Sequence, residues 1–223
     1  MLDQITPIII TYNEAPNIGR ALEKLHWAKD IVIIDSFSND ETLSIIAKFP
    51  GVRVFQRNFD CPANQFNFAL KETGITSEWV LTLGADYILT DNFIRELEKL
   101  VPKPNMDGYY CHFLYCIFGL PLRGSVYPPR VSLFRKTKAY YRQDGHTEQL
   151  IINGKVDDLQ SCIMHDDRKS LSRWIIAQDG YAKLEADKLI ALDSHHLNWP
   201  DRVRKMRIIA PPAIFFYCLL FGC

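Results

Sequence analysis

The chain has 223 residues, a length that fits one large domain or one domain with an appendage. Hydrophobic residues make up 48% and charged residues 23%, which excludes disordered, collagen-like and disulfide-knot classes. The 26 basic and 26 acidic residues give a net charge of zero, so no global attraction to nucleic acid is expected. The six cysteines form no CxxC pair, which argues against a zinc ribbon and favours a reduced, cytosolic chain.

The first hundred residues alternate between predicted strands and predicted helices. The apolar run Ile5–Ile10 is typical of a strand covered on both faces, and further strands are predicted from the runs Ile31–Ile34, Val52–Phe55 and Trp79–Leu83. Each run is followed by apolar residues at helical spacing. This alternation predicts an α/β fold with a mostly parallel central sheet and crossover helices.

The pattern changes after residue 105. Strands are expected over Tyr109–Ile117 and Val131–Phe134, and a long helix is expected from about Ser170 to Leu192. One side of this helix is apolar and consists of Leu171, Trp174, Ile175, Tyr181 and Leu184. No internal repeat or low-complexity linker separates the two halves, so residues 1–198 are expected to form one composite domain.

Residues 199–223 join a basic stretch to an apolar one. Four basic residues precede an uncharged run of sixteen residues, Ile208–Cys223. This run is shorter than the roughly 20 residues that a membrane-spanning helix needs. Two interpretations remain open, a segment that lies on an anionic membrane surface and a helix that closes the core.

Polar loops with acidic residues follow three of the predicted strands, at Thr11–Glu14, Asp35–Asp40 and Gly84–Tyr87. Ligands of open parallel sheets bind at the carboxyl ends of the strands, so these loops predict the ligand site. Asp35 ends a strand and is not placed to cap a helix, so we expect it to serve a ligand. Asp40 is expected to act as a helix cap.

No loop matches the GxGxxG or GxxxxGKS/T patterns, which argues against a dinucleotide-binding dehydrogenase and a P-loop NTPase. The single aspartate after the fourth predicted strand, Asp86, favours a divalent cation. Mg²⁺ and Mn²⁺ need few protein carboxylates and complete their shell with water and substrate phosphates. The sequence therefore suits a nucleotide diphosphate.

Three motifs resemble those of family 2 glycosyltransferases with the GT-A fold, in the same order and spacing: Ile8–Glu14, Ile33–Thr42 and Leu83–Asp86. Within that family the chain looks most like the bacterial branch that includes the lipopolysaccharide-core glucosyltransferases. That narrower likeness rests on Pro129–Arg135, Asp144–Thr147 and His165–Ser170.

The resemblance implies a GT-A domain followed by a C-terminal helical and apolar segment, in a chain that continues beyond Cys223. It also implies metal-dependent, inverting transfer of a sugar from a nucleotide diphosphate, expected to be a UDP-sugar. The acceptor would be a lipopolysaccharide, an exopolysaccharide or a lipid-linked glycan. Such an enzyme would be cytoplasmic and associated with the inner face of the cytoplasmic membrane.

The resemblance also assigns roles to individual residues. Asp35 would accept a hydrogen bond from N3–H of uracil. The other residues of the nucleotide pocket would be Thr11, Tyr12, Asn13, Glu14, Ser36, Gln65, Ala85 and Asp86. Asp86 would be the second acid of a DXD motif and would hold Mn²⁺ or Mg²⁺ together with His165. The candidates for the diphosphate are His165, Arg130 and Arg135. The two arginines flank an apolar stretch of a predicted strand, so one is expected to face the diphosphate and the other solvent. The first DXD position is Gly84, so one acidic contact of the family is missing.

Inverting transfer needs a general base that takes the proton of the acceptor hydroxyl. The candidates in the second half are Asp144, Glu148, Asp166 and Asp167. The resemblance favours Glu148, with Asp144 as the alternative. Lys169 and Arg173 are expected to form the solvated start of the long helix.

Two other functions stay open. A nucleotidyltransferase uses a similar sheet and metal, but the loop Thr11–Pro16 lacks the glycine-rich, basic character that such enzymes need. A binding module without catalysis would explain Gly84 as a decayed position, although Asp35 and Asp86 remain. The expected partners are a nucleotide-sugar donor and a glycan or glycolipid acceptor, with peripheral membrane contact and no nucleic acid.

Overall fold

The structure is a computed structural model, and it describes residues 1–124, 127–191, 197, 199–206 and 208–220. Its strands are β1 (Ile5–Thr11), β2 (Ile31–Asp35), β3 (Val52–Gln56), β4 (Trp79–Gly84), β5 (Tyr87–Leu89), β6 (Met106–Ile117), β7 (Leu120–Pro121), β8 (Arg130–Arg135), β9 (Ala139–Asp144), β10 (Thr147–Ile152) and β11 (Lys155–Asp167). Its helices are α1 (Ile18–Glu23), α2 (Thr42–Ile46), α3 (Pro62–Glu72), α4 (Asp91–Lys99), α5 (Leu171–Ala191), α6 (Trp199–Lys205) and α7 (Ala210–Leu220). Short 3-10 turns lie at Leu2–Gln4 and Lys136–Lys138.

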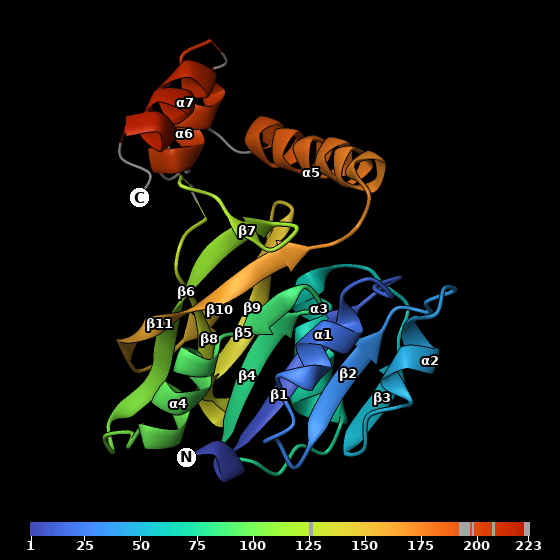
Figure 1. Ribbon diagram of the computed structural model, residues 1–223. Coiled ribbons are helices and arrows are strands. Elements are labelled where there is room, and N and C mark those ends of the chain that lie inside the picture. Colours follow the sequence, from blue (N-terminus) through green and yellow to red (C-terminus); the bar gives the residue numbers. More distant parts are fainter. Residues whose placement is uncertain (125–126, 192–196, 198, 207, 221–223) are drawn as a thin grey trace.

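In the described part of the chain, nine strands form one sheet in the order β3-β2-β1-β4-β8-β6-β11-β5, with β7 paired to β6 (Figure 1). The strands β3, β2, β1 and β4 are parallel neighbours, as the alternation of strands and helices predicts. β8 runs antiparallel between β4 and β6, whereas β11 is parallel to β6. β9 and β10 form a separate antiparallel hairpin.

Helices cover both faces of the parallel half, which explains its continuous apolar runs. In β2, Ile31 and Ile33 belong to the core cluster that contains residues of α1, α2 and α4. Val32 and Ile34 belong to the cluster that contains residues of α3. Successive strand residues point to opposite faces, so every side chain of this strand is buried. The loops at the carboxyl ends of these strands therefore rest on a rigid platform.

The longest described strand, β11, has no counterpart among the predicted elements. Only three of its side chains are buried, namely Leu159, Ile163 and Asp166. A strand of this kind shows no apolar run, because its position depends on pairing with β6 and β5. The second half is built onto the sheet of the first half, as the sequence predicts, but with antiparallel pairs that the sequence does not reveal.

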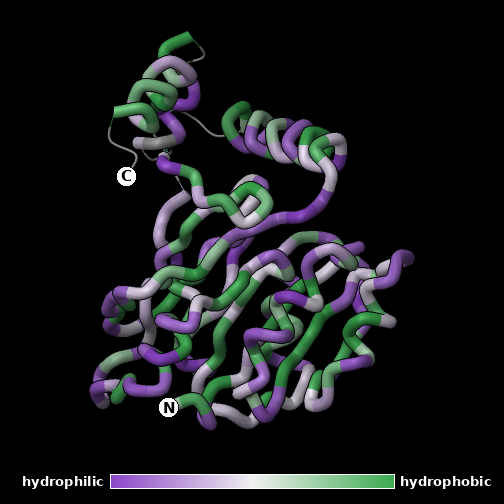
Figure 2. The backbone as a smooth tube through the Cα atoms, in the orientation of Figure 1, coloured by the Kyte–Doolittle hydropathy of each residue, from purple (hydrophilic) through white to green (hydrophobic). Residues whose placement is uncertain are grey.

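The helix α5 lies across the carboxyl ends of the parallel strands, and α6 and α7 follow it (Figure 1). Figure 2 shows α7 as a hydrophobic helix. Its large apolar side chains are exposed, namely Ile214, Phe215, Phe216, Tyr217, Leu219 and Leu220. The described part of this helix therefore does not close the core, and residues 221–223 of the predicted tail lie outside the described residues. Within the described residues, every helix is too short or too polar to cross a membrane.

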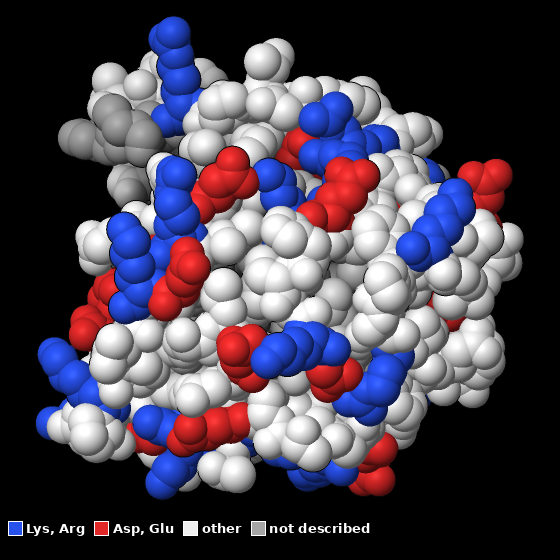
Figure 3. Space-filling model, turned by 60° about the horizontal axis from the view of Figure 1, so that its bottom comes forward, with Lys and Arg blue, Asp and Glu red and all other residues white. Residues whose placement is uncertain are grey.

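Charges are mixed on the surface. On the face drawn in Figure 3, basic and acidic side chains are interspersed and form no large field of one sign. Surface ion pairs include Lys24 with Asp91 (2.8 Å) and Lys29 with Asp3 (3.0 Å). The charge of this face is therefore mixed, like that of the whole sequence.

Candidate active site

The three polar loops meet at one edge of the sheet. Thr11 lies opposite Asp35 in the register of β1 and β2, and Ile10 lies opposite Gly84 in the register of β1 and β4. The loops that follow these strands therefore form one continuous surface at the carboxyl ends of β1, β2 and β4, where ligands of open parallel sheets bind.

Hydrogen bonds join the loop after β1 to the loop after β2. The backbone N–H of Asn13 donates to Oγ of Ser38 (2.9 Å), and Oδ1 of Asn13 accepts from the N–H of Asn39 (2.8 Å). Asn13 has a φ of 54°, in the left-handed region that asparagine tolerates. The side chain of Asn13 is thus engaged by the neighbouring loop, whereas the side chain of Tyr12 is exposed and free to meet a ligand.

Asp35 is fully buried, and its carboxylate is hydrogen-bonded within the protein. It accepts from the N–H (3.0 Å) and the hydroxyl (2.5 Å) of Ser38 and from Nε2 of Gln56 (3.3 Å). Asp35 caps no helix, as the sequence predicts, but it also shapes the loop after β2. Gln65 extends this network by donating from Nε2 to Oγ of Ser36 (2.8 Å).

Asp86 and His165 come from distant parts of the chain and meet in a hydrogen bond of 3.0 Å between Oδ2 and Nε2. β11 pairs antiparallel with β5, which places His165 opposite Tyr87. Burial alone would raise the pKa of Asp86, but the hydrogen bond from His165 and the charges of His165 and Lys169 hold that pKa below its ordinary value. Ala85 packs in the core and positions Asp86. The site thus presents an ionised carboxylate.

Aromatic rings surround His165. The centroid of its imidazole lies 4.9 Å from that of Tyr87, 4.5 Å from that of Tyr115 and 5.1 Å from that of Tyr127. The hydroxyl groups of Tyr87 and Tyr127 are hydrogen-bonded to each other at 2.5 Å. The sequence does not predict this cluster, because no pattern shows that β5, β6 and the loop before β8 converge on one histidine.

Two buried side-chain polar atoms of the described residues have no hydrogen-bond partner, Oγ1 of Thr11 and Nδ1 of His165. Such atoms are rare in folded proteins, and each calls for an explanation. Both belong to the carboxyl edge of the sheet, and the sequence places both residues in the site. Their common location marks this edge as the place where a polar ligand would complete the hydrogen bonds of the protein.

The donor set suits a divalent cation that shares its ligands with a substrate. Asp86 offers a carboxylate and His165 an imidazole, and both groups bind Mn²⁺. No group of three His, Cys, Asp or Glu side chains forms a metal cluster among the residues that the structure describes. A cation held by Asp86 and His165 would therefore take its other ligands from phosphate oxygens and water.

Gly84 leaves room for Asp86. A Cβ atom at position 84 would lie 2.7 Å from Oδ1 of Asp86 and 3.2 Å from the ring of Tyr87. Real Cβ atoms do not approach other heavy atoms as closely as 2.7 Å, so any side chain at position 84 would displace the carboxylate. Glycine at the first DXD position is therefore required by this placement of Asp86, which weakens its interpretation as a sign of decay.

Gly84→Ala is expected to weaken Mn²⁺ binding about tenfold, because overpacking costs about 1–3 kcal/mol and here falls on the carboxylate of Asp86. Titration of Mn²⁺ followed by electron paramagnetic resonance measures the effect. Gly180→Ala on α5 is the matched control, since a Cβ atom there meets nothing within 4 Å. Equal Mn²⁺ affinity in both variants would show that the carboxylate of Asp86 is not a metal ligand in this position.

Glu148 is linked to the His165 side of the site through Arg130. Nη2 of Arg130 forms an ion pair with the carboxylate of Glu148 and donates to its carbonyl oxygen (3.0 Å). Nη1 of Arg130 donates to the hydroxyl of Tyr127 (3.4 Å), whose ring contacts His165. Burial would lower the pKa of Arg130, but the charge of Glu148 and the contacts with Tyr87 and Tyr127 together outweigh it, and the pKa is raised. Arg130 therefore stays charged beside the aromatic cluster.

Two other candidate bases have structural partners. Asp144, at the end of β9, forms an ion pair with Lys188 of α5 (2.7 Å). Asp166 is fully buried and pairs with Arg20 (2.5 Å) and Arg168 (2.8 Å). Asp166 thus joins β11 to α1 and is not accessible to an acceptor.

Arg135 lies at the opposite edge of the sheet, and its predicted place near the diphosphate is wrong. β8 runs antiparallel to β4, so Arg135 is paired with Trp79 at the start of β4. Its guanidinium forms an ion pair with Glu78 and donates from Nε to the carbonyl oxygen of Met106 (2.9 Å). A strand rises about 3.3 Å per residue, which separates Arg135 from Arg130 by about 16 Å.

Lys169 and Arg173 both attach the start of α5 to the loop after β1. Nζ of Lys169 lies 2.5 Å from Oε1 of Glu14, and its side chain is only 20% exposed. Arg173 is exposed and donates from Nη2 to the carbonyl oxygen of Asn13 (3.1 Å). The expectation of a solvated helix start is therefore wrong for Lys169, which is a site residue. The contact joins residues 155 positions apart, so no local pattern of the sequence indicates it.

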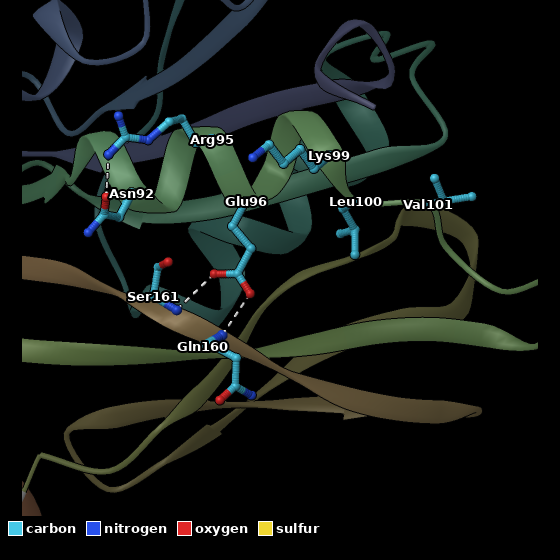
Figure 4. A pocket seen from close by; sticks show the side chains of 8 residues that line it. All are labelled: Asn92, Arg95, Glu96, Lys99, Leu100, Val101, Gln160 and Ser161. Atoms are coloured by element: carbon cyan, nitrogen blue, oxygen red, sulfur yellow. Dashed lines mark hydrogen bonds between the residues drawn. The ribbon is translucent and has the colours of Figure 1, made fainter.

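A separate hollow lies between α4 and β11, and Figure 4 shows its lining residues: Asn92, Arg95, Glu96, Lys99, Leu100, Val101, Gln160 and Ser161. The carboxylate of Glu96 points into it and accepts from the backbone N–H groups of Gln160 and Ser161 (2.8 Å each). Glu96 therefore fastens α4 to β11. The buried unpartnered atoms of the described residues lie at the carboxyl edge and not in this hollow.

The profile of the glycosyl transferase family 2 matches residues 6–159. This chain belongs to that family. It is 33% identical over 110 residues to a glycosyltransferase of Rickettsia bellii (strain RML369-C), a match that covers 49% of this chain and 36% of that protein. It is 25% identical over 228 residues to the lipopolysaccharide core biosynthesis glycosyltransferase LpsC of Rhizobium meliloti (strain 1021), over 97% of this chain and 80% of that protein. The matched segment thus spans little more than a third of the rickettsial relative.

Solved structures with the same fold include two complexes with nucleotide-sugars. S. aureus TarS 1–349 in complex with UDP-GlcNAc has a TM-score of 0.56 at 16% identity and covers 86% of this chain and 69% of that one. The mannosyltransferase PcManGT from Pyrobaculum calidifontis, in complex with GDP-Man and Mn²⁺, has a TM-score of 0.56 at 15% identity. The match covers 98% of this chain and 70% of that one. The predicted family and GT-A fold are therefore confirmed.

Proposed function

We propose that this chain is a glycosyltransferase whose domain, residues 1–198, takes a sugar from a nucleotide diphosphate, with UDP as the nucleotide. The observation that carries the proposal is the pair of buried unpartnered atoms, Thr11 Oγ1 and His165 Nδ1, at the edge where Asp86 also lies. Family membership supplies the reaction class. TarS and PcManGT, which share the fold, hold UDP-GlcNAc and GDP-Man.

The proposed reaction inverts the anomeric carbon of the sugar. The oxygen of the acceptor hydroxyl forms a bond to that carbon as the bond between the carbon and the diphosphate oxygen breaks. The electron pair of the broken bond leaves with the nucleoside diphosphate, and the hydroxyl proton passes to a carboxylate of the protein. Asp86 and His165 would hold a divalent cation, which when bound neutralises charge on the diphosphate.

We assign the role of general base to Glu148. It belongs to the same chain of contacts as His165, through Arg130 and Tyr127, whereas Asp144 lies at the turn that contacts α5. Its side chain is 13% exposed, so a carboxylate at this place is shielded from bulk water but reachable. Arg130 would hold the carboxylate of Glu148 in position until the acceptor binds.

Asp35→Ala is expected to weaken UDP binding about 10- to 100-fold, with Mn²⁺ and with EDTA alike, because hydrogen bonds to a charged acceptor contribute about 1.5–3 kcal/mol. Two effects combine here, loss of the proposed contact to N3–H of uracil and loss of the bonds that hold Ser38. Calorimetric titration measures the affinity. Ser38→Ala is the matched control, since it disturbs the same loop and leaves the carboxylate in place. An equal loss of UDP affinity in both variants would show that Asp35 only supports the loop and does not contact the nucleotide.

We place residues 199–223 at a membrane surface and the acceptor among lipid-linked or envelope glycans. The described part of this segment puts the exposed apolar side chains of α7 directly after the basic residues of α6. Helices with such a composition bind anionic interfaces. The likeness to LpsC, a lipopolysaccharide core biosynthesis glycosyltransferase, supports an acceptor of that kind.

The double variant Phe215→Ser, Phe216→Ser is expected to bind vesicles that contain phosphatidylglycerol at least about tenfold more weakly than the unaltered chain, since each buried phenylalanine contributes about 1.5–3 kcal/mol. Cosedimentation with such vesicles measures the difference. Phe59→Ser, at an exposed phenylalanine after β3, serves as the control. If the unaltered chain stays in the supernatant with and without vesicles, the segment has another role.

Calorimetric titration of UDP, GDP and CDP into the purified chain, with Mn²⁺ and then with EDTA, tests the proposed function. The expected result is selective binding of UDP that weakens strongly in EDTA. Selective binding of GDP or CDP would correct the donor. If folded protein binds none of the three nucleotides, the proposed function is wrong.

A further inference from the structure

The ammonium group of Lys169 lies among carboxylates at the carboxyl edge of the sheet. Its Nζ is 2.5 Å from Oε1 of Glu14 and 3.5 Å from Oδ2 of Asp167. Burial would lower the pKa of Lys169, but the charges of Glu14, Asp167 and Asp86 outweigh it and the pKa is raised. A positive charge is therefore fixed beside the residues that we propose for the leaving group.

Asn17 holds this arrangement together. Its side chain is fully buried, and Nδ2 donates to Oε2 of Glu14 and to Oδ1 of Asp167 (2.8 Å each). Its Oδ1 accepts from the backbone N–H of Arg168 (2.9 Å), and the N–H of Lys169 donates to Oδ1 of Asp167 (2.9 Å). The surroundings of the ammonium group are thus set before any ligand arrives, and preorganised charges stabilise a developing charge best.

The charges at this edge suit a cation better than a diphosphate. Asp86, Asp167 and Glu14 are three acids that face one ammonium group, and a diphosphate would add negative charge to them. Gly84 leaves out the acid that the family carries at the first DXD position, so the repulsion is smaller here. A cation at Asp86 would offset part of the remaining repulsion between these acids and the diphosphate. The fixed positive charge of Lys169 can offset another part of it.

We propose that the ammonium group of Lys169 donates a hydrogen bond to the diphosphate of the bound nucleotide-sugar and stabilises its charge as the nucleoside diphosphate leaves. This inference rests on the proposed function. An ammonium group has three donor hydrogens, and the hydrogen bond to Glu14 uses one of them. Lys169 can therefore keep its contact with Glu14 while it meets a phosphate oxygen, as lysine does in other phosphate sites.

A purely structural role predicts a different behaviour. If Lys169 only fastened the loop after β1 to the start of α5, its loss would disturb the whole nucleotide pocket. The affinities for UDP and for uridine would then fall together. A contact with the diphosphate instead affects UDP and leaves uridine unchanged, because uridine has no phosphate.

The test compares UDP and uridine binding to Lys169→Met, Lys169→Arg and the unaltered chain, by calorimetry for UDP and by ligand-observed NMR for uridine. Lys183→Met is the matched control, because the side chain of Lys183 is exposed on α5 and forms an ion pair with Asp179 (2.6 Å), another exposed residue of the same helix. Lys169→Met leaves the carboxylate of Glu14 without its charged partner, so Lys169→Met is also combined with Glu14→Gln and compared with Glu14→Gln alone. Circular dichroism confirms that each variant is folded.

Lys169→Met is expected to weaken UDP binding about 10- to 100-fold, as loss of a charge-assisted hydrogen bond does, with uridine binding unchanged. Lys169→Arg, which keeps the charge, should recover part of the UDP affinity. Parallel loss of UDP and uridine binding, or UDP binding that Lys169→Met does not alter, would overturn the inference and leave the proposed function standing. If the unaltered chain binds no nucleotide, the proposed function falls and the inference falls with it.

Discussion

Asp86→Asn is expected to lower the rate of sugar transfer by on the order of 10²–10³-fold, the size of effect that loss of one preorganised electrostatic contact has in other enzymes. Asparagine has the size of aspartate and can keep the contact with His165, but it lacks the charge that would hold a divalent cation. Asp86 follows the end of β4 and does not belong to the hydrophobic core, so the substitution should leave the fold intact. Release of UDP from a panel of UDP-sugars in the presence of Mn²⁺ measures the rate.

Asp91→Asn is the control for this experiment. Asp91 is exposed at the start of α4 and pairs with Lys24 (2.8 Å), away from the carboxyl edge of the sheet. It should release UDP at the rate of the unaltered chain. A fully active Asp86→Asn variant with unchanged Mn²⁺ dependence would remove Asp86 from the metal site and leave the cation without its main ligand.

Glu148→Gln is expected to lower the rate of transfer by on the order of 10²–10⁴-fold, the usual contribution of a general base, while the affinity for UDP stays unchanged. Glutamine keeps an oxygen that can accept from Arg130, but it cannot take a proton from the acceptor hydroxyl. The decisive result is a lower rate of transfer at unchanged affinity for UDP, because a disordered site would lower both the rate and the affinity. Single-turnover kinetics and calorimetry on the same preparation measure the two quantities.

Asp144→Asn is the matched control, since Asp144 lies on the same hairpin and also forms an ion pair, with Lys188. It should lose little activity. Substitution of Glu148 leaves Arg130 with less compensating charge, so a thermal melt of Glu148→Gln must accompany the kinetics. Should Asp144→Asn prove the more damaging change in a folded protein, the general base lies at the end of β9.

The first half of the fold is readable from the sequence because three of its strands, β1, β2 and β4, are buried on both faces. Continuous runs such as Ile31–Ile34 leave no other interpretation, and the helices between them have regular apolar spacing. The second half lacks this property. β11 is thirteen residues long with three buried side chains, and its place depends on pairing with β6, whose partner residues lie some fifty positions earlier.

The same difference decides which site residues the sequence predicts. Thr11 and Asp86 follow parallel strands, so their convergence at one edge is a consequence of topology. Arg135 was placed wrongly because the direction of β8 is a tertiary property that a short apolar run does not show. The sequence does not predict that Lys169 lies in the site, because its environment depends on Glu14, 155 positions earlier. No local pattern indicates such a contact.

The most direct test of the central claim is a crystal structure of the chain with UDP and Mn²⁺. The nucleotide is predicted at the carboxyl ends of β1, β2 and β4, with the diphosphate near Asp86, His165 and Lys169 and the uracil near the loop that Asp35 shapes. Thr11 Oγ1 should have gained a hydrogen-bond partner in that complex. Nucleotide bound elsewhere, for example in the hollow between α4 and β11, with the carboxyl edge unchanged, would contradict the proposed site.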